Sequence, residues 1–328
     1  MVRMGATQRV VFLRACFLAA ALVCLFPISP VFAACQANDT ATVTQVTQLN
    51  WSALQKPGGA TTYIISGTGG ADGGTGMHLY QTSARGQYNV VKDNNEGTPC
   101  TITIDIKNVV PGNANLAIGT WTGNYNGANL GAGPPWAGLA LPGAGKTLFL
   151  GATATYQAAI PIGTLTPTFN IQITYAAGAP KLSGQTANIK FDTALSTTTN
   201  VGTIDYGAVK AGIAGATYAV STTGVLTVGG GGMALYGTPA AASFNLIGST
   251  TQTVVVGVSY SAANNGTTAS LARCAYNGLA ETACSTIGTV AAPGAGKIML
   301  VGATVTSDGT AAAGVTATPT LTLSFTYT

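Results

Sequence analysis

Apolar and polar residues alternate along short segments of this chain, which is the pattern of β-strands with one buried face. The clearest cases are residues 169–175 and 321–327, and segments 101–106, 148–156 and 253–258 continue the pattern between clusters of Gly and Pro. The chain is therefore predicted to be all-β. A period of two places the following side chains on the inward face: Phe169, Ile171, Ile173, Tyr175, Leu321, Leu323, Phe325 and Tyr327.

The chain also repeats itself. Three blocks recur in the same order, and the matched pairs are Thr166–Tyr175 with Thr318–Tyr327, Pro142–Lys146 with Pro293–Lys297, and Gly76–Tyr80 with Gly232–Tyr236. Matched blocks in constant order indicate two copies of one domain. We expect two tandem immunoglobulin-like β-sandwiches of about seven strands each, at residues 34–176 and 188–328, joined by a linker at 177–187.

The first residues have the features of an export signal. Arg3, Arg9 and Arg14 precede an apolar run at 15–26, and Val31-Phe32-Ala33 places small or apolar residues before a cleavage site. We predict a signal peptide at 1–33, export by the general pathway into the periplasm, and a final location at the cell surface or in a fimbrium. The apolar run is shorter than the roughly 20 residues of a membrane-spanning helix.

Charge excludes one class of partner. The chain has 13 Lys and Arg residues, of which three leave with the signal, against 9 Asp and Glu. The mature chain is therefore nearly neutral. No basic surface is indicated, and we expect no binding of nucleic acid.

Four cysteines remain after cleavage. In an oxidising compartment the simplest pairing is one disulfide per domain, Cys35 with Cys100 and Cys274 with Cys284, although the other pairings stay open. A second interpretation of Cys35 is lipidation, because Phe32-Ala33-Ala34-Cys35 is a loose version of a lipoprotein signal. Lipidation would leave Cys100 without that partner.

Candidate chemistry does not support an enzyme. Residues 140–147 fit a relaxed phosphate-binding loop, but they lead into a predicted strand and not a helix, so we expect no nucleotide. His78 is the single histidine and has Ala234 as its counterpart, which argues against a catalytic relay or zinc. The run 93–96 is a predicted turn, not a calcium site. We expect no catalytic residues, no metal and no cofactor.

One loop region differs between the copies. Residues 108–142 are rich in Gly and Asn and contain apolar and aromatic residues that have two interpretations. Either they cover one end of the sandwich as core, or they project and bind a surface. The residues in question are Trp121, Tyr125, Pro134, Pro135, Trp136, Leu139 and Leu141.

The second copy resembles a family of bacterial secreted domains of unknown function, which is similar in layout to spore coat protein U and to archaic chaperone–usher pilus subunits. The first copy looks like a diverged relative, with Leu49-Asn-Trp51 in place of Ile204-Asp-Tyr206 and an early Cys35. The motifs that carry the resemblance are Ile204–Gly207, Gly231–Leu235, Ala242–Leu246, Gly302–Thr304 and Leu321–Tyr327.

The resemblance implies a mode of assembly. Pilin-like sandwiches of this type lack one strand and receive it from a periplasmic chaperone and later, at the usher, from a neighbouring subunit. It implies a two-domain tip adhesin that attaches to an abiotic or host surface, with 321–327 as the edge strand that takes part in assembly. The alternative is a secreted coat or matrix protein in which both sandwiches are complete and no strand is donated.

Overall fold

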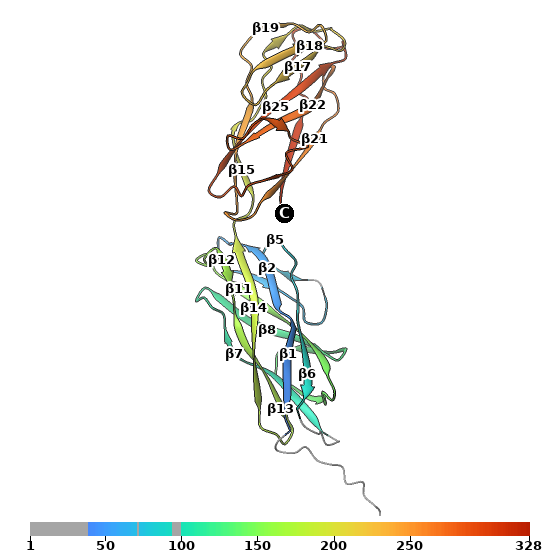
Figure 1. The fold of residues 1–328 in the computed structure, drawn as a ribbon. Helices are drawn as coiled ribbons and strands as arrows, with labels where there is room; N and C mark the ends of the chain where they lie inside the picture. The colour runs from blue at the N-terminus through green and yellow to red at the C-terminus, as the bar shows by residue number, and fades with distance from the viewer. Residues whose placement is uncertain (1–38, 71, 94–99) are drawn as a thin grey trace, which may run out of the picture.

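The computed structural model describes residues 39–70, 72–93 and 100–328, and every regular element in them is a β-strand, as predicted. The predicted signal peptide and Cys35 lie outside the described residues. The strands form two sandwiches stacked end to end (Figure 1). The described part of the chain contains no helix with the length and apolar character that a membrane crossing requires.

The first sandwich contains fourteen strands in chain order. They are β1 (Ala41–Thr47), β2 (Leu49–Gln55), β3 (Thr61–Ile64), β4 (Gly73–Gly74), β5 (His78–Tyr80), β6 (Gly86–Lys92), β7 (Thr101–Val110), β8 (Leu116–Tyr125), β9 (Ala128–Ala132), β10 (Trp136–Ala140), β11 (Lys146–Tyr156), β12 (Gly163–Leu165), β13 (Thr168–Tyr175) and β14 (Lys181–Asp192).

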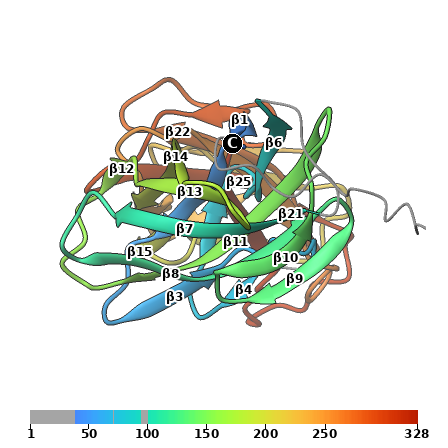
Figure 2. The same cartoon turned by 90° about the horizontal axis from the view of Figure 1, so that it is seen from below.

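These strands make two sheets that face each other. One runs β1-β6-β11-β3-β4, with β8 and β9 attached through β11, and the other runs β10-β7-β13-β14-β2-β5, with β12 beside β14. Figure 2, seen from below, shows β7 and β13 side by side. Alternate side chains of both sheets meet in one core that extends from Ala41 to Phe191 along the chain.

The second sandwich repeats most of this plan. Its strands are β15 (Ser196–Val201), β16 (Ala208–Val209), β17 (Thr217–Val220), β18 (Leu226–Gly229), β19 (Ala234–Tyr236), β20 (Ala242–Ile247), β21 (Val254–Tyr260), β22 (Thr267–Tyr276), β23 (Thr282–Ala283), β24 (Thr289–Val290), β25 (Lys297–Ser307) and β26 (Leu321–Tyr327). The sheet β15-β20-β25-β17-β18, with β22 and β23, matches the first sheet strand for strand. Its core, however, is divided into two clusters.

The boundary between the sandwiches differs from the predicted one. Residues 177–187 are not a linker, because Gly178 belongs to a tight turn and Lys181–Asp192 then forms β14 of the first sandwich. The Gly and Pro residues of this segment mark the turn between β13 and β14. The connection to the second sandwich is residues 193–195, so this sandwich begins after Asp192 and not at residue 188.

Candidate functional site: a sheet with one strand position open

Strand β14 completes the second sheet of the first sandwich. It pairs antiparallel with β13, from Thr168 opposite Thr186 to Ile173 opposite Lys181. Its second half pairs in parallel with β2, from Ala187 opposite Leu49 to Asp192 opposite Gln55. One strand therefore joins β13 and β2 by backbone hydrogen bonds on both of its edges.

The inward side chains of β14 fill the first core. Ala187, Ile189 and Phe191 are fully buried, and the ring of Phe191 lies 4.8 Å from that of Tyr156, centroid to centroid. Burial raises the pKa of the Tyr156 hydroxyl to about 12. The apolar residues at every second position of this half of β14 thus fill the space between β2 on one edge and β12, which leads into β13, on the other.

The second sandwich has no strand in this position within residues 193–328, which the structure describes throughout. Its second sheet is divided into a three-stranded sheet, β24-β21-β26, and a two-stranded sheet, β16-β19. Among the described residues, no strand pairs with the edge of β26 that faces away from β21. The repeat makes β26 the counterpart of β13 and β16 the counterpart of the end of β2, so the gap corresponds to the place of β14.

Side-chain burial follows the same division. Phe169, Ile171, Ile173 and Tyr175 of β13 are buried, whereas every inward residue of β26 is only half-buried. On the other side of the gap, Leu49 and Trp51 are buried, but their counterparts in the second sandwich are half-buried. The half-buried residues of both walls are Ile204, Tyr206, Ala208, Val209, Leu321, Leu323, Phe325 and Tyr327. We call this set the acceptor groove.

The backbone along residues 204–210 already has the shape that β2 has beside β14. In β2 the Ser52 amide donates to the Asn50 side chain at 2.8 Å, and Ser52 has a φ of 61°. In the second sandwich the Gly207 amide donates to Asp205 at 2.8 Å, with a φ of 67°. The groove wall is therefore formed before any strand is added.

The floor of the groove is also preserved. The Trp51 indole donates to the Ala152 carbonyl at 3.2 Å, and the Tyr206 hydroxyl donates to the Ala303 carbonyl at 3.1 Å. Burial holds the pKa of Tyr206 above its usual value, so the hydroxyl stays a neutral donor at physiological pH. The inward residues of 321–327, which were predicted to form an edge strand used in assembly, line the wall of the acceptor groove opposite residues 204–210.

The predicted surface-binding loop does not project. Trp121, Tyr125 and Trp136 are buried, and Leu139 and Leu141 pack against the same core, so the interpretation as a binding tip is wrong for these side chains. Trp121 lies on β8, and its ring is 4.8 Å from that of Phe169. Pro134 is half-buried, and Pro135 is exposed.

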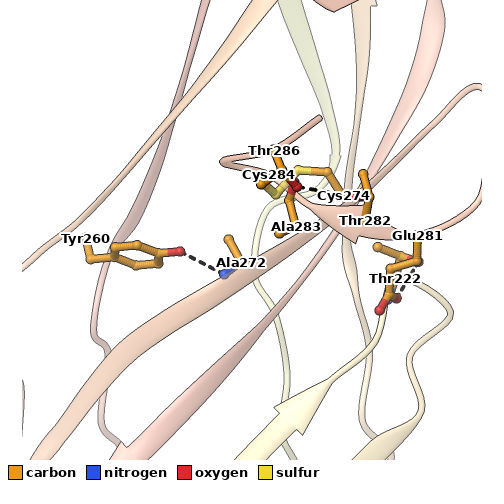
Figure 3. The surroundings of a disulfide bond; sticks show 9 residues. All are labelled: Thr222, Tyr260, Ala272, Cys274, Glu281, Thr282, Ala283, Cys284 and Thr286. Atoms are coloured by element: carbon orange, nitrogen blue, oxygen red, sulfur yellow. Dashed lines mark hydrogen bonds between the residues drawn. A yellow bond between two sulfur atoms is a disulfide. The ribbon is translucent and has the colours of Figure 1, made fainter. Parts of the chain in front are cut away.

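In the second sandwich, a disulfide lies at the place where Trp136 packs in the first sandwich. The predicted bond between Cys274 and Cys284 is confirmed, with Cα atoms 5.0 Å apart, and links β22 to the segment after β23 (Figure 3). Nearby, Glu281 accepts hydrogen bonds from the Thr222 amide at 2.6 Å and hydroxyl at 2.8 Å. In the first sandwich the ring of Trp136 covers Gly123, the counterpart of Cys274.

The remaining candidate residues form no further site. Cys100 is not a free thiol, and Cys35, its expected partner, lies outside the described residues. His78 is exposed on β5. Within residues 39–70, 72–93 and 100–328, no group of three or more His, Cys, Asp or Glu side chains could hold a metal ion. Of the run 93–96, only Asp93 is described.

No family model matches the chain, and no curated protein matches it. A solved structure described as a chaperone–tip adhesin complex vital for activation of CFA/I fimbriae biogenesis is 7% identical, with 90% of this chain and 89% of that chain covered, at a TM-score of 0.26. The secreted serine protease VesC from Vibrio cholerae is 11% identical, with 89% and 51% covered, at a TM-score of 0.18.

Proposed function

We propose that this chain is an exported subunit of a surface fibre that is assembled by strand addition, and that its second sandwich is the part that accepts the strand. The observation that carries the proposal is the open position beside β26, which β14 fills in the first sandwich. An open sheet edge beside an apolar groove is the feature that strand addition uses. The chain's own β14 demonstrates the kind of strand that fits.

The chemistry of the groove specifies the incoming strand. It should be extended, run antiparallel to β26, and carry apolar residues at every second position, as Ala187, Ile189 and Phe191 do. In the first sandwich the side-chain Nδ2 of Asn188 donates to Oδ1 of Asn50 at 3.1 Å. Asp205 stands at the position of Asn50, so we expect a hydrogen-bond donor at the matching place of the incoming strand.

An open groove also needs cover during export. An exposed edge strand with apolar side chains is a template for aggregation. We therefore propose that a periplasmic chaperone strand occupies the groove in transit, and that a neighbouring subunit's strand replaces it at an usher. The first sandwich already holds β14, so the chain receives one donor strand and its first sandwich forms the free end of the fibre, as in a tip subunit.

The experiment adds the missing strand to the mature chain, residues 34–327, in place of Thr328. Residues 176–192 are appended directly after Tyr327, which reproduces the turn and strand that follow Tyr175 in the first sandwich. In the matched control, the residues of the appended copy that correspond to Ile189 and Phe191 are replaced by Ser. Thermal unfolding is recorded for both proteins and for the unextended chain.

We expect the unfolding transition of the second sandwich to rise by about 10 °C or more in the extended chain. Burying two large apolar side chains contributes roughly 1.5–3 kcal/mol each, and 1 kcal/mol corresponds to about 4 °C for a domain of this size. The Ser control should show little of this rise, and the transition of the first sandwich should not move. A second sandwich that is indifferent to the added strand would favour a self-contained coat or matrix protein instead.

A further inference from the structure

The junction between the two sandwiches is built around the end of β14. Tyr80 of the first sandwich donates its hydroxyl to the carboxylate of Asp192, the last residue of β14, which is itself buried. The ammonium group of Lys190 lies 5.1 Å from the centre of the Tyr80 ring and 3.7 Å from the Asp192 carboxylate. Tyr80 is consequently only 5% exposed.

The second sandwich closes this junction from its own side. The Ser249 hydroxyl donates to Asp192 at 2.6 Å, and the ring of Tyr327 lies edge-on to that of Tyr80, with centroids 5.1 Å apart. The Tyr327 hydroxyl donates to the Thr193 carbonyl and accepts from the Ser249 amide at 2.6 Å. Figure 1 shows the C-terminus between the two sandwiches. Thus the strand that fills the first sandwich leads directly into the domain that covers Tyr80.

The second sandwich carries the same face at its far end. Tyr236 lies opposite Ala208 in the pair β16–β19, as Tyr80 lies opposite Ala53 in the pair β2–β5. The backbone amide of Lys210 donates to the Met233 carbonyl at 2.9 Å. Gln55 is the counterpart of Lys210, and its backbone amide donates to the Met77 carbonyl at 2.8 Å. In Figure 1 this region, marked by β19, is the end of the molecule away from the junction.

The two copies of this face differ in exposure at particular positions. Tyr236 is 78% exposed, against 5% for Tyr80, and Leu235 is 52% exposed where Leu79 is half-buried. Met77 and Met233, on the same segments, are 59% and 50% exposed. The two copies therefore differ at the leucine and the tyrosine, and the tyrosine of the first copy is covered by the end of β14 and by Tyr327 of the following sandwich.

We infer that the face formed by Lys210, Leu235 and Tyr236 is the docking surface for a β-sandwich domain of the neighbouring subunit whose leading strand fills the acceptor groove. This inference rests on the proposed function. The Lys210 ammonium group and the Tyr236 hydroxyl set the chemistry of the contact. The incoming strand ends in an acidic residue, in the place of Asp192, that accepts from the Tyr236 hydroxyl. This residue lies opposite Lys210, which supplies the positive charge that Lys190 supplies in the first junction.

The arrangement predicts how subunits follow one another. A strand that runs antiparallel to β26 leaves the groove beside Tyr236, just as β14 leaves the first sandwich beside Tyr80. The domain that follows the strand is then held head to tail on the one before it. Such a contact joins two different surfaces, which is the kind of contact from which open fibres are built.

The test extends the mature chain by a whole domain. Residues 176–328 are appended after Tyr327, so that a second copy of β14 and of the second sandwich follows the first copy. A Tyr236→Leu change in the appended copy alone gives its peptides a different mass, so that hydroxyl-radical labelling with mass spectrometry reports the exposure of Tyr236 in the middle sandwich, with Met233 as the internal control. A companion variant replaces Asp192 by Ala in the appended copy alone.

We expect the labelling of Tyr236 in the middle sandwich to fall to the level of Tyr80, while Met233 stays labelled as Met77 is. The Asp192→Ala change in the appended copy should restore part of the Tyr236 labelling. If the unfolding temperature of the middle sandwich rises but Tyr236 stays as reactive as in the unextended chain, the groove accepts a strand and the proposed docking surface is wrong. If the transition does not rise at all, the proposed function fails, and this inference fails with it.

Discussion

The two sandwiches share one plan and differ by one strand. In the first, β13 has β7 on one side and β14 on the other, and its inward side chains are buried. In the second, the corresponding β26 has a partner on one side only among the described residues, and the same positions are half-buried. The comparison shows that the inward side chains beside this position are fully buried where β14 is present and only half-buried where no strand lies there.

The largest effect should come from placing a charge on the matched inward positions, Ile173 in β13 and Phe325 in β26. Ile173→Asp buries an uncompensated carboxylate in a closed core and should destabilise the first sandwich by about 3–5 kcal/mol or more. Phe325→Asp should destabilise the second sandwich by less than half of that, because the side chain already borders an open groove. Denaturant unfolding of the two variants measures both values, and equal losses would mean that the second core is closed. Phe325→Asp should in addition abolish the stabilisation by an appended strand.

Trp136→Ala should follow in size. The indole is buried above Gly123, and removing a buried tryptophan of this kind costs about 3–5 kcal/mol through lost contacts and a cavity. The matched control is Val110→Ser on the exposed side of β7, which should change stability by no more than about 0.5 kcal/mol. An unchanged unfolding midpoint for Trp136→Ala would place the indole outside the core and revive a role at the surface.

The disulfide provides the counterpart in the second sandwich. Replacing both Cys274 and Cys284 by Ala removes a bond that closes a loop with a sequence separation of 10 residues. Loss of such a constraint should destabilise the second sandwich by about 2–3 kcal/mol, with no effect on the first. Calorimetry that resolves the two transitions would check this, and a shift in the first transition would contradict the separation of the two cores.

The sequence was sufficient for the parts of the fold that depend on local pattern. The period-two alternation in 169–175 and 321–327 predicted the strands β13 and β26, and the repeat predicted two similar domains. The close spacing of Cys274 and Cys284 favoured the disulfide that the structure confirms. In each case the signal lies within a short segment or in a direct match between two segments.

The parts that failed depend on contacts between distant segments. The Gly and Pro residues before β14 led to the prediction of a linker at 177–187. The strand pattern was present nonetheless, because Ala187, Ile189 and Phe191 are apolar residues at every second position. This pattern spans the predicted boundary between residues 187 and 188 and was therefore missed. Laying the copies side by side leaves residues 181–192 unmatched, and that was the available signal for the acceptor groove. The direction in which Trp121 and Trp136 point could not be predicted, since Gly-rich sequence around them shows no clear alternation.

The smallest expected effect concerns how β14 is held at its beginning. Lys181 at the start of β14 forms an ion pair with Asp93, which also accepts a hydrogen bond from Thr40 at 2.9 Å and another from Thr42. Burial alone would raise the pKa of Asp93, but these partners, Lys181 first, lower it below its ordinary value of 3.8. A carboxylate with a lowered pKa stabilises the folded state above its ordinary pKa and loses this contribution as the pH falls below it.

Lys181→Ala should therefore destabilise the first sandwich by about 1 kcal/mol or less at neutral pH, as is usual for a solvent-accessible pair. The difference from the wild-type chain should shrink as the pH falls below 3.8, where Asp93 takes up a proton. Lys107→Ala, which removes an ion pair within β7 alone, is the matched control, since it does not touch β14. Unfolding midpoints measured from neutral to acidic pH would decide the matter. A loss for Lys181→Ala that persists at low pH would show that the lysine anchors β14 through packing of its aliphatic chain and not through Asp93.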